Sequence, residues 1–112
     1  MLDRGVDCDK CNEYYESPIM IACLRGKTEI VKMLLDRGVD YKKCNYEGLS
    51  PIMKACQHGR TEIVKMLLDS GIDYNECYKS GQSPIMKACE YDKIEIVQIL
   101  LDRGADFHKC DK

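Results

Sequence analysis

Apolar and polar residues follow a pattern that returns every 33 residues along the chain. Ser17–Met20 reads Ser-Pro-Ile-Met, and the same four residues return twice more. Thr28–Asp36 recurs as Thr61–Asp69 and, less closely, as Ile94–Asp102. A fixed period of this length is typical of a solenoid, in which each unit buries its apolar face only against its neighbours. The pattern therefore predicts a stack of like units with an extended surface, and hence a binding function.

The central unit predicts two helices joined by a turn. Ser50 is a suitable N-cap, and Pro51 fits the first helical position, where its missing N–H is no loss. Gly59 ends this helix, and Thr61 can cap a second one. The second helix has too many apolar positions for one narrow stripe, so we expect neighbours on two sides of it. The repeat places first helices at Ser17–Leu24, Ser50–Gln57 and Ser83–Glu90, and second helices at Thr28–Asp36, Thr61–Asp69 and Ile94–Asp102.

Four motifs recur in register and resemble a known family. Ser-Pro-Ile-Met-x-Ala, the Gly that follows, Glu-Ile-Val-Lys-x-Leu-Leu and Gly-Val-Asp closely resemble the ankyrin repeat, a unit of 33 residues with a β-turn and two helices. The resemblance implies an all-α ankyrin-repeat solenoid of stacked helix-turn-helix units joined by β-turn or hairpin loops. It implies a single domain over 1–112, with a partial repeat at 1–11, complete repeats at 12–44, 45–77 and 78–110, and the start of another turn at 111–112.

Two of the departures from the family pattern bear on helix packing and on a turn. Ankyrin units usually carry Thr-Pro-Leu-His, whereas Met20, Met53 and Met86 stand here in place of the His, so we expect an apolar contact instead of the Thr–His hydrogen bond. Asp92 stands where the other units have Gly. Asp tolerates left-handed geometry better than most residues, so this turn should form with some strain.

The eight cysteines follow the same period, with only Cys8 outside it. Stacked elements lie roughly 10 Å apart, whereas a disulfide needs Cα atoms within about 7 Å, so equivalent cysteines should not pair. We expect reduced thiols and a cytoplasmic or nuclear setting. The pair Cys8 and Cys11 raises a zinc or redox alternative, although no second pair supplies the remaining ligands. One position in the first helices holds Cys23, Cys56 and Cys89. Because free Cys behaves as a small apolar side chain, we expect all three to be packed.

Charge and polar motifs exclude several function classes. The net charge of −2 gives no reason to expect nucleic acid, which requires a basic face. The longest uncharged apolar stretch is too short for a bilayer, and the first residues do not resemble a signal peptide. His58 and His108 occupy different unit positions, and Ser50 and Ser83 are interpreted as helix caps. We therefore expect a soluble protein that is not an enzyme and takes no metal, cofactor or small-molecule substrate.

The family resemblance implies a partner protein that lies on the concave side, against the β-turn tips and the first helices. At these positions the residues vary while the scaffold repeats, so they should carry specificity. We predict that Tyr46, Leu49 and His58 lie together there and that replacing Tyr46 and Leu49 hardly affects folding. The full predicted surface comprises Glu13, Tyr14, Glu16, Leu24, Arg25, Tyr46, Glu47, Leu49, Gln57, His58, Lys79, Ser80, Gln82, Glu90 and Tyr91.

Other interpretations stay open. The chain could serve as a structural spacer within a longer array, because Ile21 and Leu24 make its first unit more apolar than the later ones, as in a fragment that lacks a neighbour. We expect a monomer, with end-to-end association through uncapped terminal repeats as the alternative. Asn75 stands in a context that resembles ankyrin loops modified by asparaginyl hydroxylases, although Asn is common there. One loop position is aromatic in each unit and holds Tyr41, Tyr74 and Phe107. We expect these side chains to pack between units and only secondarily to bind a partner.

Overall fold

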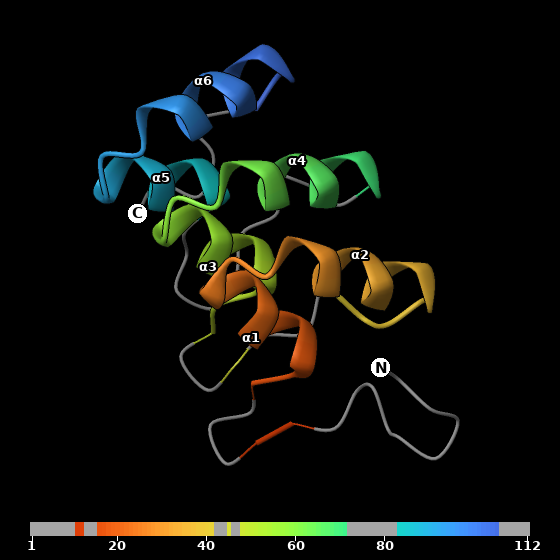
Figure 1. Cartoon of the computed structure of the whole chain (residues 1–112). Helices are drawn as coiled ribbons and strands as arrows, with labels where there is room; N and C mark the ends of the chain where they lie inside the picture. The colour runs from red at the N-terminus through yellow and green to blue at the C-terminus, as the bar shows by residue number, and fades with distance from the viewer. Residues whose placement is uncertain (1–10, 13–15, 42–44, 46–47, 72–82, 106–112) are drawn as a thin grey trace.

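The described part of the chain forms six α-helices, paired in consecutive units (Figure 1). The computed structural model describes residues 11–12, 16–41, 45, 48–71 and 83–105. The helices are α1 (Pro18–Arg25), α2 (Thr28–Asp36), α3 (Pro51–Gln57), α4 (Thr61–Asp69), α5 (Pro84–Glu90) and α6 (Ile94–Asp102). The predicted all-α architecture of stacked helix pairs is confirmed.

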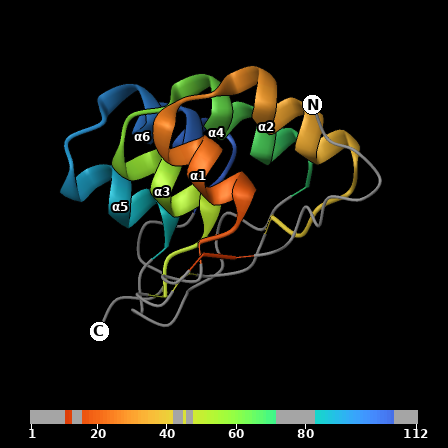
Figure 2. The same cartoon turned by 60° about the horizontal axis from the view of Figure 1, so that its bottom comes forward.

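The helices form two layers. The first helices of the three units, α1, α3 and α5, lie side by side in one layer, and the second helices, α2, α4 and α6, form the other (Figure 2). Each first helix packs against the second helix of its own unit and against the first helices of neighbouring units. Equivalent residues of successive units therefore follow one another in rows along the stack.

Serine holds the predicted N-cap position of each first helix, but of these three described serines only Ser17 makes a side-chain capping hydrogen bond. Ser17, Ser50 and Ser83 are extended N-cap residues, each followed by Pro at the first helical position. The Oγ of Ser17 accepts a hydrogen bond from the Met20 N–H at 3.4 Å. The expectation that Thr61 caps α4 is wrong, because the N-cap is Arg60 and Thr61 is the first helical residue.

The turn between the two helices of each unit uses a left-handed residue. Its φ is 72° at Gly26 and 70° at Gly59. Asp92 takes the same conformation, with φ of 58°, and is the one residue other than Gly with positive φ in the part of the chain that the structure describes. The predicted left-handed turn at Asp92 is confirmed.

The core runs between the two layers and from unit to unit. Val64 and Leu67 of α4 are completely buried, and Ile63 and Leu68 nearly so, which confirms that this helix has neighbours on two sides. Met20 and Met53 are also completely buried, as expected for an apolar contact in place of a hydrogen bond. Tyr41 packs against the core and donates its hydroxyl hydrogen bond to the Ser70 carbonyl oxygen at 3.0 Å, joining adjacent units.

Candidate interaction surface

Eight of the fifteen predicted partner-binding residues lie in the part of the chain that the structure describes. Glu13, Tyr14, Tyr46, Glu47, Lys79, Ser80 and Gln82 lie outside the described residues. So do other residues singled out in the sequence, namely Cys8, Cys44, Tyr74, Asn75, Cys77, Phe107, His108 and Cys110.

Asn12 and Asn45 close the loops of the first two predicted turn tips by hydrogen bonds to the residue four positions later. The side-chain oxygen of Asn45 accepts a hydrogen bond from the Leu49 N–H at 3.0 Å, and the Asn45 N–H donates to the Leu49 carbonyl oxygen at 2.9 Å. Asn12 makes the same two bonds with Glu16, both at 3.0 Å. The ends of these two loops are therefore held together beside the first helices.

Leu49 does not belong to the surface. Its side chain is only 7% exposed and is part of the hydrophobic core, so the expectation that it contacts a partner and can be replaced without loss of stability is wrong. Leu49 lies directly before the N-cap Ser50 and closes the loop on Asn45. An apolar side chain at this position turns inward, because burial removes its surface from water.

Six predicted residues form two parallel rows at the ends of the first helices. Because α1, α3 and α5 lie side by side (Figure 2), residues at one unit position become neighbours along the stack. Arg25, His58, Glu90 and Tyr91 are exposed, and Leu24 and Gln57 are half-buried. The rows are Leu24, Gln57, Glu90 and then Arg25, His58, Tyr91.

In the third unit a buried lysine joins two of these residues. Lys87 is only 8% exposed, and its Nζ lies 3.4 Å from Glu90 Oε1 and 5.4 Å from the centre of the Tyr91 ring. A buried ammonium group requires such partners, because losing its water is costly. The three side chains therefore hold one another in place, and 40% of Tyr91 remains open to solvent.

Around His58 the surface is strongly basic. Partial burial, together with the positive charges of Lys54, Arg60 and Lys93, lowers the pKa of His58, which therefore favours its neutral form at pH 7. Arg60 is not among the surface residues predicted from the sequence. The sequence does indicate a basic position there, because the residue before each second helix is basic, namely Lys27, Arg60 and Lys93.

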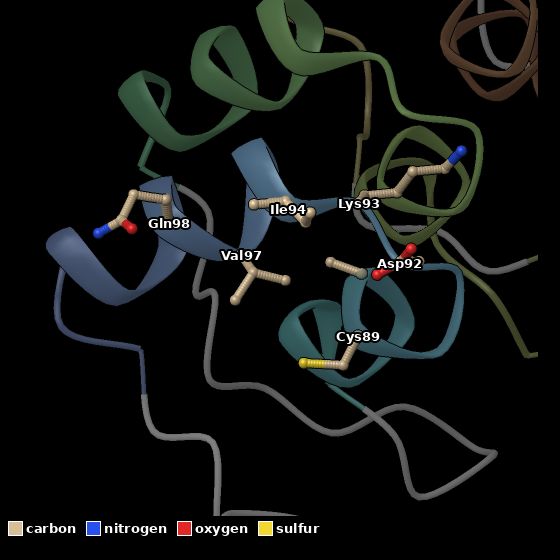
Figure 3. A pocket seen from close by; sticks show the side chains of 7 residues that line it. Cys89, Asp92, Lys93, Ile94, Val97 and Gln98 are labelled. Carbon is tan, nitrogen blue, oxygen red and sulfur yellow. The ribbon is translucent and has the colours of Figure 1, made fainter.

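The three helical cysteines differ in burial although they share a unit position. Burial raises the pKa of Cys23 to about 12 and the pKa of Cys56 further still. The expectation that Cys89 packs in the same way is wrong, because Cys89 is exposed. It lines an open hollow of about 310 Å³ on the third unit together with Val97 of α6 and Ile94 (Figure 3).

Within the described ranges, no group of three or more His, Cys, Asp or Glu side chains is placed to hold a metal ion. No helix in the same ranges is both long enough and apolar enough to cross a bilayer.

Comparison with known proteins bears on almost the whole chain. The family model described as "Ankyrin repeats (3 copies)" matches residues 1–78 and again residues 46–111. A search of curated proteins found no match.

Proposed function

Because the chain belongs to the ankyrin repeat family, we propose that it is an interaction module that binds a partner protein through the first-helix layer and the adjoining turn tips. Ankyrin repeats are generally protein–protein interaction modules and are typically non-catalytic. The proposed activity is therefore binding alone, with no reaction on the partner.

The division between repeated and varied residues carries the proposal. Residues that return unchanged, such as Ala22, Ala55 and Ala88, are buried beneath the surface of the first helices. Residues that change from unit to unit lie at the exposed ends of these helices, as Arg25, His58 and Tyr91 do. A stack built this way keeps one scaffold while presenting a distinct row of side chains, which is the arrangement that specific recognition requires.

Tyr46 and Tyr91 are the aromatic residues to test first. Tyr is favoured at interfaces for its large contact area and low ordering cost. Tyr46 belongs to the predicted turn tip of the second unit, and Tyr91 is exposed at the end of α5. The full chain is immobilised to capture partners from a cell extract, and each captured protein is then purified and its affinity measured by titration calorimetry. We expect the double change Tyr46→Ala, Tyr91→Ala to weaken binding by at least about 2 kcal/mol, the scale of a hot-spot loss.

Lys65 supplies the control, because it is exposed on α4 in the other layer. The change Lys65→Ala should leave the affinity of the captured partner unchanged. If Lys65→Ala abolishes binding and the Tyr46 and Tyr91 change does not, the partner docks on the second helices and the proposed surface is wrong. If no captured protein binds the purified chain, the spacer interpretation replaces the proposal.

A further inference from the structure

A basic hollow lies between the first and second units, where each first helix turns into the second. It has a volume of about 480 Å³ and is lined by Leu24, Arg25, Lys27, His58 and Arg60. Four of its five residues carry basic side chains, and none is acidic. Only Leu24, Arg25 and His58 belong to the surface predicted from the sequence; Lys27 and Arg60 extend it.

Arg60 is fixed in the wall of the hollow. Its Nε and Nη2 atoms donate hydrogen bonds to the Leu24 carbonyl oxygen at 3.1 Å and 3.0 Å. Its guanidinium lies over Gly26, where an added Cβ would be 3.0 Å from Cζ and Nη1. A guanidinium group has five N–H donors, so these two bonds leave three for a ligand. Because the group is already ordered, an anion that binds it loses little affinity to side-chain ordering.

The other basic groups are exposed or partly exposed at the same place. Arg25 and Lys27 are exposed on the first unit, and His58 is exposed on the second. His58 also faces Lys54 from its own helix and Lys93 from the third unit, and these cations help to lower its pKa. Three carboxylates line neighbouring hollows: Asp92 and Glu95 share a second hollow with His58, and Glu62 lines a separate hollow of about 130 Å³ together with Arg60.

The next hollow along the stack differs from the basic hollow in the charges of its lining residues. It has a volume of about 310 Å³, and Lys93 lies over Gly59 there as Arg60 lies over Gly26. Asp92 and Glu95 line it together with His58 and Lys93, so the protein supplies its own negative charge. Of these two hollows in the described part of the chain, the one between the first and second units offers positive charge without an acidic lining residue.

We propose that this basic hollow binds carboxylate side chains of an acidic segment in the partner protein. The inference rests on the proposed function and names the chemistry of the partner at one part of the surface. Three cations, Arg25, Lys27 and Arg60, surround one space together with the neutral ring of His58, which suits carboxylates. The half-buried Leu24 offers an apolar contact beside them. A nucleic acid fits less well, because the positive charge does not continue into the next hollow and the net charge of the chain is −2.

Fluorescence anisotropy with labelled peptides tests the inference on the full chain. The probe is a short peptide rich in Glu and Leu, and its comparison peptide has Gln in place of every Glu. We expect the Glu peptide to bind and the Gln peptide not to bind, and binding should weaken as salt is raised, since these charges are open to solvent. The double variant Arg25→Gln, Lys27→Gln should weaken binding of the Glu peptide about tenfold.

A matched variant controls for net charge. Lys32 and Lys65 are exposed on α2 and α4, and Gln98 already occupies their position in the third unit. The variant Lys32→Gln, Lys65→Gln removes the same charge and should bind the Glu peptide within about twofold of the original chain. Equal weakening by both double variants, or equal binding of the Glu and Gln peptides, would overturn the inference.

Further measurements test other anionic ligands and distinguish failure of this inference from failure of the proposed function. If a phosphoserine peptide or single-stranded DNA binds while the Glu peptide does not, the carboxylate assignment is wrong. The ring signals of His58 should shift when the Glu peptide is added, and the pKa of His58 should rise because a bound carboxylate favours the charged ring. If a captured partner loses affinity with Tyr46→Ala, Tyr91→Ala but not with Arg25→Gln, Lys27→Gln, the hollow plays no part and the proposed function still stands.

Discussion

The second and third units carry nearly the same apolar residues but bury them differently. Cys56 is completely buried, whereas Cys89 at the same unit position is exposed. Leu68 is 6% exposed and its counterpart Leu101 is 42% exposed. The difference lies in the neighbour, because α4 is in contact with both α2 and α6. In this stack, the unit that follows decides whether a side chain is core or surface.

The first unit shows the same effect on its other side. Ile30 is 47% exposed, whereas its counterparts Ile63 and Ile96 are each 1% exposed. The Ile position therefore faces the preceding unit, while the Cys56 and Leu68 positions face the following one. Each interface between units joins these two kinds of position, and the second unit is the one that has both covered.

The largest effect should come from truncating the core of the second unit. Leu67→Ala removes a completely buried side chain, and we expect it to lower the free energy of unfolding by about 2–5 kcal/mol. The matched pair sharpens the comparison: Leu68→Ala should cost about 2 kcal/mol or more, and Leu101→Ala less than about 1 kcal/mol. Urea unfolding of the three variants measures these changes. Equal costs for Leu68→Ala and Leu101→Ala would mean that the third unit is covered as fully as the second.

Thiol labelling compares Cys56 and Cys89 directly. Labelling requires an accessible thiolate, so Cys89 should react in the folded protein, whereas Cys56 should react only when the stack opens. We expect the two rates at neutral pH to differ by about a hundredfold or more, as read peptide by peptide in mass spectra. Unfolding in denaturant should make the rates similar. Rapid labelling of Cys56 in the native protein would show that the interface between the second and third units is open.

The buried thiols should make stability depend on alkaline pH. Burial raises the pKa values of Cys23 and Cys56 above the ordinary thiol value of 9.0. Below pH 9 both the folded and unfolded chains keep these protons; above it the unfolded chain releases them first, so the free energy of unfolding falls as pH rises. Each thiol contributes a slope of at most about 1.4 kcal/mol per pH unit. The variant Cys23→Ala, Cys56→Ala should show a shallower slope between pH 9 and 11, and an unchanged slope would contradict the assignment.

The repeat makes the helices predictable, because the same local sequence signals return in each unit. The three second helices have the predicted bounds, and the Ser-Pro pairs start the first helices. Local signals do not reveal what a neighbouring unit covers, which is why Cys89 was expected to be packed. The prediction that Leu49 lies on the surface was wrong for a related reason. The sequence shows only that its position varies, and variation alone does not distinguish a binding residue from an inward-facing one.

The basic hollow shows a second limit of the sequence. Arg25, Lys27, His58 and Arg60 come from two units, so only the stacking of α1 on α3 brings them together. The recurrence of Lys27, Arg60 and Lys93 at one unit position was visible in the sequence, but the hydrogen bonds from Arg60 to the Leu24 carbonyl oxygen were not. A side chain that reaches across units cannot be located from the pattern of a single unit.

Hydrogen–deuterium exchange with a captured partner tests the central claim most directly, because it reports on both helix layers at once. If the partner binds the first-helix layer, exchange should slow in the last turns of α1, α3 and α5, around Arg25, His58 and Tyr91. Exchange in the middle of α2, α4 and α6 should stay as it is in the free chain. Slowing confined to α2, α4 and α6, with α1, α3 and α5 unchanged, would show that the partner binds the opposite layer and would contradict the proposed function.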